Sequence, residues 1–420
     1  MKSFAQVEAW LATIQPDIRA VNWFFALEDM QDFMANLNNP QNTPKIVHVA
    51  GTSGKTSTCY FLSELLQTSN RRVGLSVSPH VDSVRERVQI NNQPLAEHEF
   101  VEMFKEFASL PEVQSMQITY FGLLVAFAYW VYAQKKADYA VIEVGMGGRL
   151  DATNIVTNPN KICVITDIGM DHTQFLGEDL ATIAGEKAGI IMPGADVFVA
   201  HQSKEVMNVF NKVAKKQNAA LHILPDNVIE DSPEDLPPFQ RRNFALAKFT
   251  HDFIVKRDNL ISVDTNTLNK IAHTSVPARM EAFKYQDKTI ITDGSHNAHK
   301  IGALVSGLEQ TYPDQKMAAM VSFVDGKDVT LKESLQELKK VSDNLIVTMF
   351  KKSQDVQRGP ISPDTIAETA KSVGFSSVTV VENPKEAFKH LLKQPEERLL
   401  VTGSFYLLNH VRPLLLSKHD

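Results

Sequence analysis

Residues 45–57, KIVHVAGTSGKTS, restrict the fold of this 420-residue chain more than any other stretch. An apolar run leads into a turn with Gly51 and Gly54, and a lysine with hydroxyl residues opens a helical pattern. Glycines let backbone N–H groups approach an anion closely, and the N-terminal end of a helix attracts negative charge. The order therefore predicts a strand, a phosphate-binding turn and a helix, although Val49 departs from the G-x-x-x-x-G-K-[ST] spacing of the usual P-loop.

The side chains after the turn favour ATP as the bound anion. Lys55 would neutralise the β- and γ-phosphates, and Thr56 or Ser57 would place a hydroxyl on Mg²⁺. An ordinary glycine turn between a strand and a helix is the alternative. On the ATP interpretation, the residues that hold the phosphates are Gly51, Thr52, Ser53, Gly54, Lys55, Thr56 and Ser57.

Apolar runs alternate with helical patterns along both halves of the chain. The first set is RRVGLSV, ADYAVIEV, KICVIT and ADVFVA, and the second is KTIITDG, MAAMVSFV, NLIVTMF, SSVTVV and RLLVTG. Such alternation predicts parallel sheets covered by helices. Residues 272–283 then look like a connection between two units. We predict an α/β protein with a P-loop parallel-sheet ATPase domain at 1–275 and a smaller Rossmann-like α/β domain at 276–420.

Charge and cysteine content argue against several classes of protein. A net charge of −6 provides no basic field for nucleic acid or an anionic membrane. The most apolar stretch, 120–133, is too short to span a bilayer and predicts a buried helix. The N-terminus lacks the uninterrupted apolar run of a signal peptide. Cys59 and Cys163 are too few and too far apart for a disulfide framework, so we expect a cytoplasmic protein without nucleic-acid or membrane partners.

Glu143 ends an apolar run in VIEVGMGGRLDATN, residues 141–154. Ligands of open α/β sheets collect at the carboxyl ends of strands, where the Lys55 turn should also lie. A carboxylate there can bind Mg²⁺ directly or through water. A glycine-rich turn in which Glu143 caps a helix is the alternative, and GMGG does not match the dinucleotide-binding G-x-G-x-x-G.

Residues 165–194 contain two further candidates. His172 follows a strand and could be a metal ligand or a structural histidine. Lys187 lies in a helical pattern, either as a solvated cation at the helix end or as a lysine carbamylated by CO₂ that carries Mg²⁺. In the second unit, Asp293 and His296 follow a strand, and Arg279 lies near the expected domain junction, where each could reach a nucleotide or be a turn or surface charge.

Motifs along nearly the whole chain resemble, in order, those of the folylpolyglutamate synthase/dihydrofolate synthase family within the Mur ligase superfamily. They are LNNPQNTPKIVHVAGTSGKTS, SVSPH, RERVQIN, EVGMGGRLDATN, DHTQFLG, EKAGIIMPG, RRNFALA, PARME, TDGSHN and VTGSFYLLNHVRPLL. Each motif is weak by itself, but so many in the same order leave little room for chance.

The resemblance implies a role for each matching residue. Beyond the glycine-rich loop, the expected nucleotide contacts are Asn243, Arg279 and Asp293. The first Mg²⁺ would be bound by Thr56, Ser78 and Glu143, and a second by His172 and the carbamate on Lys187. The implied catalytic set is Lys55, His172, Lys187, Asp293 and His296. Positions matching the pterin site are Thr119, Leu150, Asp151 and Ala152, with Trp23, Phe24 and Phe25 of an early loop.

The same resemblance implies an ATP-dependent ligase, expected as a monomer, that adds L-glutamate to dihydropteroate, to reduced folates or to both. ATP would phosphorylate the acid, and the amine of glutamate would displace phosphate from the acyl phosphate. Three residues depart from the family pattern: Ala26, Thr56 and Gly122, the last where TYFG replaces threonine-x-phenylalanine-glutamate.

Two other functions remain as alternatives. A Mur-type ligase could act on a UDP-linked cell-wall precursor, but no additional N-terminal UDP-binding domain is evident in the sequence. A non-catalytic nucleotide-binding protein should have lost its metal ligands, whereas this chain retains Ser78, Glu143, His172 and Lys187.

Overall fold

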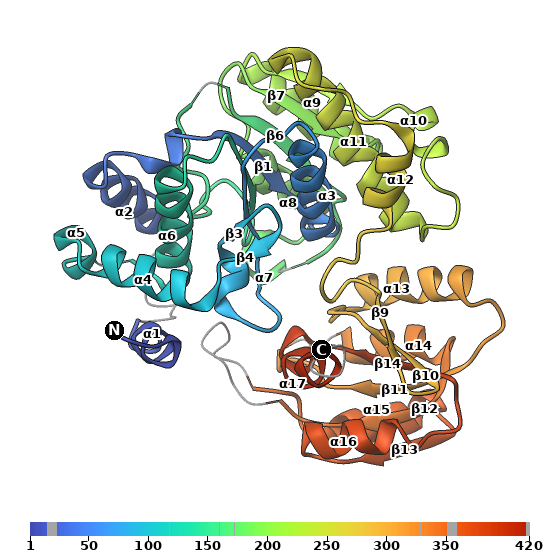
Figure 1. Ribbon diagram of the computed structural model, residues 1–420. Coiled ribbons are helices and arrows are strands. Elements are labelled where there is room, and N and C mark those ends of the chain that lie inside the picture. Colours follow the sequence, from blue (N-terminus) through green and yellow to red (C-terminus); the bar gives the residue numbers. More distant parts are fainter. Residues whose placement is uncertain are drawn as a thin grey trace. The chain divides into compact units, whose positions relative to one another are not determined.

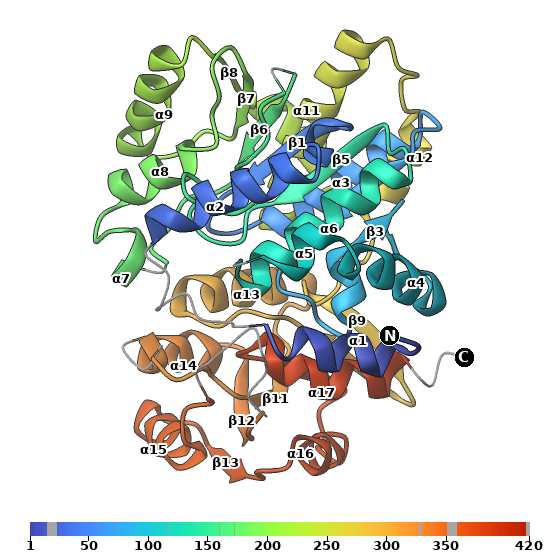
Figure 2. The same ribbon diagram turned by 90° about the vertical axis from the view of Figure 1, so that its left-hand side faces the viewer.

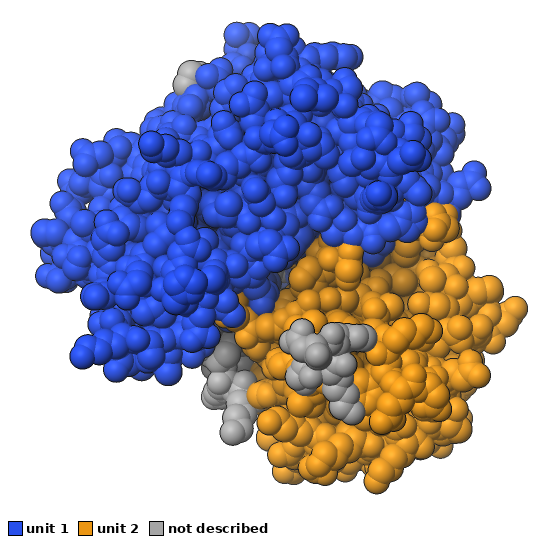
Figure 3. All heavy atoms as spheres, in the orientation of Figure 1, with its two compact units in different colours: residues 1–80, 84–234, 240–274 blue, residues 81–83, 235–239, 275–420 orange. Residues whose placement is uncertain are grey.

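The computed structural model describes residues 1–14, 23–116, 118–158, 160–171, 173–326, 330–350 and 359–416, without the side chains of 23–26 and 174. The chain forms two compact units (Figure 3). Unit 1 comprises residues 1–80, 84–234 and 240–274, and unit 2 comprises 81–83, 235–239 and 275–420. The chain passes from unit 1 to unit 2 for the last time after residue 274, one residue before the predicted boundary at 275. The short segments 81–83 and 235–239, which the prediction placed in the first domain, belong to unit 2.

Within the described chain, unit 1 is built on an eight-stranded sheet in the order β4-β3-β2-β5-β1-β6-β7-β8 (Figure 1). Neighbouring strands pair in parallel except for the β2–β3 and β3–β4 pairs. The strands are β1 (Lys45–Ala50), β2 (Val73–Ser76), β3 (Gln89–Ile90), β4 (Gln93–Pro94), β5 (Tyr139–Glu143), β6 (Ile162–Ile165), β7 (Asp196–Val199) and β8 (Ala220–Ile223). Because β1 lies between β5 and β6, the turns that follow these three strands meet at one edge of the sheet.

Helices cover both faces of this sheet (Figures 1 and 2). Ile46 and Ala50 of β1 belong to apolar clusters that include residues of the helices on the α6 and α8 side, and Val47 and Val49 face the opposite way, toward α3. The α-helices are α1 (Phe4–Leu11), α2 (Trp23–Asn36), α3 (Lys55–Gln67), α4 (Glu97–Ala108), α5 (Pro111–Gln114), α6 (Tyr120–Gln134), α7 (Thr173–Leu176), α8 (Leu180–Ala188), α9 (Lys204–Lys216), α10 (Asp226–Glu230), α11 (Pro238–Asp258) and α12 (Thr265–Ala272), with short 3₁₀ turns η1 (Pro40–Asn42) and η2 (Val84–Arg87).

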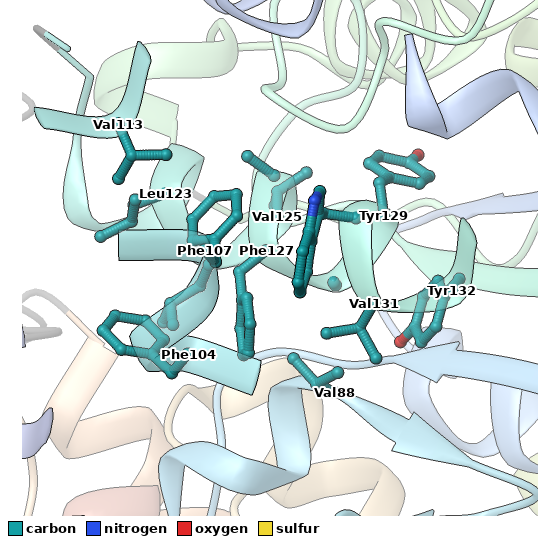
Figure 4. Packing of buried hydrophobic residues seen from close by; sticks show 14 of the residues in the cluster. Val88, Phe104, Phe107, Val113, Leu123, Val125, Phe127, Tyr129, Val131 and Tyr132 are labelled. Carbon is teal, nitrogen blue, oxygen red and sulfur yellow. The ribbon is translucent and has the colours of Figure 1, made fainter. Parts of the chain in front are cut away.

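The apolar run at 120–133 forms α6, and the prediction of a buried helix is confirmed. Its side chains pack with those of α4 in a cluster of aromatic rings (Figure 4). The Phe127 ring lies 5.0 Å from that of Phe104 and 5.3 Å from that of Phe107, at angles that avoid face-to-face repulsion. No described helix of the chain is long and apolar enough to cross a membrane.

Unit 2 is built on a sheet in the order β13-β12-β11-β14-β10-β9, parallel except for the β9–β10 pair. Its strands are β9 (Glu281–Tyr285), β10 (Lys288–Thr292), β11 (Met317–Val321), β12 (Ser342–Val347), β13 (Ser377–Val380) and β14 (Arg398–Thr402), and its helices are α13 (Ala298–Thr311), α14 (Leu331–Lys339), α15 (Pro363–Val373), α16 (Pro384–Leu391) and α17 (Phe405–Leu416). Met317, Ala319 and Val321 pack under α13, α14 and α15, whereas Ala318 and Met320 pack under α16 and α17. The predicted α/β class, with parallel sheets covered by helices, is confirmed.

His251 of α11 is a polar side chain enclosed in the interior of unit 1. It is 1% exposed, and neither ring nitrogen has a hydrogen-bond partner among the described residues. Burial penalises the charged imidazolium and lowers the pKa of His251 to about 4. In the unfolded chain a histidine binds a proton near pH 6.5, whereas His251 in the folded chain binds one only near pH 4. The free energy of unfolding is therefore unaffected by His251 above pH 6.5 and falls as the pH decreases from 6.5 toward 4.

When the pH is lowered from 7.5 to 5.5, the free energy of unfolding should fall by about 1 kcal/mol more in the parent than in the His251→Gln variant. Urea unfolding followed by circular dichroism at both pH values measures the difference. His98→Gln, at an exposed position of α4, is the matched control and should follow the parent. Identical pH dependence in parent and His251→Gln would contradict the prediction.

Gly122 in the first turn of α6 has room for a methyl group. A Cβ there would lie 3.4 Å from Thr119 Oγ1 and 3.6 Å from Met30 Sδ, both ordinary contacts. We expect Gly122→Ala to raise the free energy of unfolding by about 0.4–1 kcal/mol, because alanine loses less backbone entropy on folding. Gly74→Ala is the contrasting variant, since its Cβ would lie 2.6 Å from the Tyr132 ring and should destabilise the protein. A lower urea midpoint for Gly122→Ala would show that the turn cannot accept a side chain.

Candidate functional site

The glycine-rich turn joins β1 to α3, and neighbouring side chains require both of its glycines. Gly51 and Gly54 have φ angles of 151° and 87°. A Cβ on Gly54 would lie 2.2 Å from Oδ1 of Asn243 in α11, and one on Gly51 would lie 1.8 Å from Oγ1 of Thr166. Any other residue at either position would strain the backbone and displace a polar neighbour. Asn243, a predicted nucleotide contact, thus lies directly against the turn.

The residues after β6 hold the other side of the turn. Thr52 N and Ser53 N donate to Asp167 O at 2.8 and 3.3 Å, and Thr166 Oγ1 donates to Ser53 O at 2.7 Å. Asp167 also forms an ion pair with Arg242 of α11 at 2.8 Å. These bonds hold the turn against the residues that follow β6.

Two groups of the turn suit an anion. Lys55, the first residue of α3, donates its Nζ to Gly51 O at 3.0 Å, which places the ammonium over the turn. Ser53 Oγ is buried and has no hydrogen-bond partner among the described residues. A cation and an unpaired hydroxyl at the N-terminal end of a 13-residue helix are the groups that phosphate oxygens bind. The predicted ATP loop therefore fits a polyphosphate.

Glu143, at the end of β5, joins the turn to the segment after β2. The carboxylate is 3% exposed; its Oε1 accepts from Thr56 Oγ1 at 2.9 Å and its Oε2 from Ser78 N at 3.0 Å. The structure thus brings Thr56, Ser78 and Glu143 together, and their binding of Mg²⁺ stays a prediction. A carboxylate beside the Thr56 hydroxyl, with Ser78 next to it, suits a hard cation such as Mg²⁺. No group of three or more His, Cys, Asp or Glu side chains that could hold a metal occurs among the described residues, so this mixed oxygen set is the candidate.

Lys187 lies near the end of α8 and is only 4% exposed. A solvated cation at a helix end, one of the two alternatives for this residue, does not fit that burial. His172 lies outside the described residues. The carbamate on Lys187 and the second metal site remain predictions.

The predicted pterin positions have different surroundings. Thr119 caps α6, since its Oγ1 accepts from Gly122 N at 3.1 Å. Asp151 is buried, and its carboxylate accepts from Met146 N at 2.8 Å and from Thr153 N and Oγ1 at 3.0 and 2.5 Å. Burial raises the pKa of Asp151, and the bonds from Thr153 oppose that rise. The Asp151 carboxylate therefore organises its own loop.

Other pterin positions are less constrained by the structure. Leu150 and Ala152, on either side of Asp151, are half-buried. The α2 helix begins at Trp23, but the side chains of Trp23, Phe24 and Phe25 lie outside what the structure describes.

In unit 2, the three predicted residues Arg279, Asp293 and His296 lie together. The Arg279 guanidinium lies 4.6 Å from the centre of the Phe405 ring, and the His296 ring meets the same ring at 6.1 Å. Asp293 accepts from Met280 N at 2.9 Å and Ser295 N at 2.8 Å. Burial raises the pKa of Asp293, whereas the charge of Arg279 lowers it.

The Arg279 turn depends on an ion pair that sequence reasoning missed. Arg412 of α17 donates to both carboxylate oxygens of Glu281 at 2.7 Å, and Glu281 also accepts from Ala278 N at 3.1 Å. A second carboxylate, that of Asp82, binds the same guanidinium. Residues so far apart in sequence carry no local signal of such contacts, although Arg412 lies inside a quoted motif.

Sequence reasoning also missed a buried polar chain beneath the 145–154 loop. His48 Nε2 of β1 lies 2.8 Å from Thr153 Oγ1, and Tyr129 OH donates to Thr153 O at 3.2 Å. Lys161 Nζ donates to Asn154 Oδ1 at 3.0 Å. Burial first, and then the charge of Lys161, place the pKa of His48 well below its usual range. The neutral histidine can thus bind the Thr153 hydroxyl without bringing a second charge into the interior.

Comparison with known proteins agrees with this geometry in both units. The Mur ligase middle domain matches residues 49–227, and the Mur ligase glutamate ligase domain matches residues 278–405. Dihydrofolate synthetase of Saccharomyces cerevisiae is 30% identical over 413 residues, which cover 91% of this chain and 95% of the yeast protein. Dihydrofolate synthase/folylpolyglutamate synthase of Bacillus subtilis is 27% identical over 417 residues, covering 92% and 94% of the two chains.

Two solved structures extend the likeness to the whole fold. Mycobacterium tuberculosis folylpolyglutamate synthase complexed with ADP matches with a TM-score of 0.83 at 26% identity, covering 98% of each chain. Escherichia coli FolC in complex with DHPP and ADP matches with a TM-score of 0.80 at 25% identity, covering 100% of this chain and 99% of the other. With the lysine-bearing turn and the Thr56–Glu143–Ser78 contacts in place, this chain belongs to the dihydrofolate synthase/folylpolyglutamate synthase family of Mur ligases.

Proposed function

We propose that this protein joins L-glutamate to dihydropteroate, to reduced folates or to both, with hydrolysis of ATP to ADP and phosphate. The observation that carries the proposal is the Glu143 carboxylate, which meets Thr56 of the glycine-rich turn and the Ser78 segment at one edge of the sheet. Family membership supports an ATP-dependent acid–amino-acid ligase. The names of the yeast and Bacillus subtilis relatives support a folate-type acid as the acceptor of glutamate.

The proposed reaction has two steps. The carboxylate of the pterin acid attacks the γ-phosphorus of ATP, so that an acyl phosphate forms and ADP leaves. The glutamate amine then attacks the acyl carbon, loses a proton and expels phosphate as the amide forms. Lys55 and the N-terminal end of α3 bind the phosphates and stabilise the charge that develops on the transferred group.

Metal binding completes the proposed site. Mg²⁺ would supply positive charge next to the phosphates, with Thr56, Ser78 and Glu143 as its binding set. His172 and a carbamate on Lys187 would hold a second ion. In unit 2, Asn297 caps α13 beside His296, and we assign Arg279, Asp293 and His296 to the nucleotide on the basis of the family motifs.

We also propose a reducing, cytoplasmic location. Cys59 and Cys163 are both free and buried, and burial raises the pKa of each thiol, which keeps it protonated and unreactive. Neither residue is used by the proposed chemistry.

The ligase function predicts a product heavier than the acid by one glutamyl unit. Mass spectrometry of reactions with ATP, Mg²⁺, L-glutamate and either dihydropteroate or tetrahydrofolate should show that product, with one phosphate released per amide. Reactions without glutamate are the control and should show no amide. Turnover of a UDP-muramoyl acceptor, with no product from any pterin acid, would assign the protein to cell-wall synthesis instead.

Carbamylation predicts a specific rescue at Lys187. A free ammonium would repel a metal ion, whereas a carbamate would attract it. Lys187→Ala should lower kcat by at least about tenfold, and acetate or formate in the buffer should restore part of the loss. Lys216→Ala, at the exposed end of α9, is the matched control and should leave activity unchanged. Full activity of Lys187→Ala without added acid would remove this residue from the site.

A further inference from the structure

The 145–154 loop packs against the last turn of α8 with no space for side chains between their backbones. A Cβ on Gly148 would lie 2.9 Å from Glu186 O, and one on Gly189 would lie 2.3 Å from Arg149 Cβ. Arg149 N donates to Glu186 O at 2.8 Å, and the Arg149 guanidinium forms an ion pair with the Glu186 carboxylate at 2.7 Å. The loop that carries predicted pterin positions and the helix that carries Lys187 thus meet in one interface.

Asn154 joins the two sides of this interface by hydrogen bonds. Its Nδ2 donates to Arg149 O and to Gly189 O, both at 3.1 Å, so one amide group joins the loop to the residue that ends α8. The orientation of the amide is set by Lys161, whose Nζ donates to Asn154 Oδ1 at 3.0 Å. With the oxygen held by an ammonium, the nitrogen must face the two carbonyl groups.

A buried, charged lysine at position 161 costs free energy of folding. It is 1% exposed and precedes β6, yet it forms no ion pair with any carboxylate among the described residues. Burial lowers the pKa of Lys161, because the charged form loses its hydration. A methionine of similar length would fill the same space without that cost and would give up only the one hydrogen bond to Asn154 Oδ1. Stability alone therefore does not account for the lysine.

We propose that Lys161 is a positioning residue for ligation: through Asn154 it holds the 149–152 turn and the end of α8 in one arrangement, and so places the pterin acid relative to Lys187. The inference rests on the proposed function for its kinetic consequence. It goes beyond that function because Lys161 is not among the residues assigned to the substrate or to a metal. The structural part, the dependence of the loop and helix end on Lys161, can be measured separately.

Lys161→Met is the decisive variant. Its urea midpoint should stay close to that of the parent, because relief of the buried charge offsets the lost hydrogen bond to Asn154. In contrast, kcat should fall by about 10- to 100-fold and KM for the pterin acid should rise. KM for ATP should stay within about twofold, because the β6 and α11 contacts to the glycine-rich turn are untouched. Lys288→Met is the control: half-buried Lys288 of unit 2 also donates to uncharged acceptors, the backbone carbonyl oxygens of Gln394 and Glu396. Its loss should not change the kinetics.

Asn154→Asp provides a second, independent variant. Aspartate still accepts from Lys161 but has no N–H for Arg149 O and Gly189 O, so it should reproduce the kinetic loss. The double variant should be no worse than the more affected single variant, because both changes break one connection. If Lys161→Met does not fold, Asn154→Asp carries the test.

Hydrogen exchange read by mass spectrometry tests the structural part without any turnover. In Lys161→Met, peptides covering 148–154 and 185–190 should exchange at least about tenfold faster than in the parent, and peptides from unit 2 should be unchanged. Unchanged exchange, or faster exchange with parental kinetics, would overturn the proposal. A parent protein that forms no amide would refute the proposed function instead, and exchange would then decide the structural role of Lys161 alone.

Discussion

The buried carboxylate of Glu143 is the interaction on which the arrangement of the site depends. A carboxylate that is 3% exposed must be fully hydrogen-bonded, and two of its bonds come from Thr56 and Ser78, which follow different strands. One residue thereby brings the glycine-rich turn and the segment after β2 to the end of β5. Because β1, β2 and β5 are neighbours and parallel, these contacts require no unusual loop geometry. The parallel sheet brings the ends of these strands to one edge, and the Glu143 carboxylate fixes the two segments there by hydrogen bonds.

Close backbone packing at glycines fixes two further contacts in unit 1. Gly54 lets Asn243 of α11 reach the glycine-rich turn, and Gly148 and Gly189 let the 145–154 loop reach the end of α8. Segments at such distances cannot shift independently, since protein interiors are packed as densely as organic crystals. Substrate-binding loops are usually the mobile parts of an enzyme. The 145–154 loop, which carries the proposed pterin positions, is instead anchored by polar side chains of Asp151, Asn154 and Lys161.

Much of the fold could be predicted because its signals are local. The strand β1, the turn and α3 are contiguous, and the alternation of apolar runs with helical patterns is enough to predict parallel sheets. The association of Thr56, Ser78 and Glu143 followed from the family motifs and from the rule that ligands bind at the carboxyl ends of strands. The burial of Lys187 could not be predicted, since a lysine near a helix end is usually solvated.

Other contacts between distant segments were decided only by the tertiary structure. The sequence by itself determined the fold class, the position of the glycine-rich turn and the family, because consecutive residues or the order of the motifs indicate each of them. It did not determine that Arg412 holds the Arg279 turn through Glu281, or that Lys161 holds Asn154 beneath the 145–154 loop. A lysine before an apolar strand has the same local pattern whether it is exposed or buried. The packing of α8 and of the 145–154 loop around Lys161 excludes water from its side chain. The ammonium then binds Asn154 in place of water.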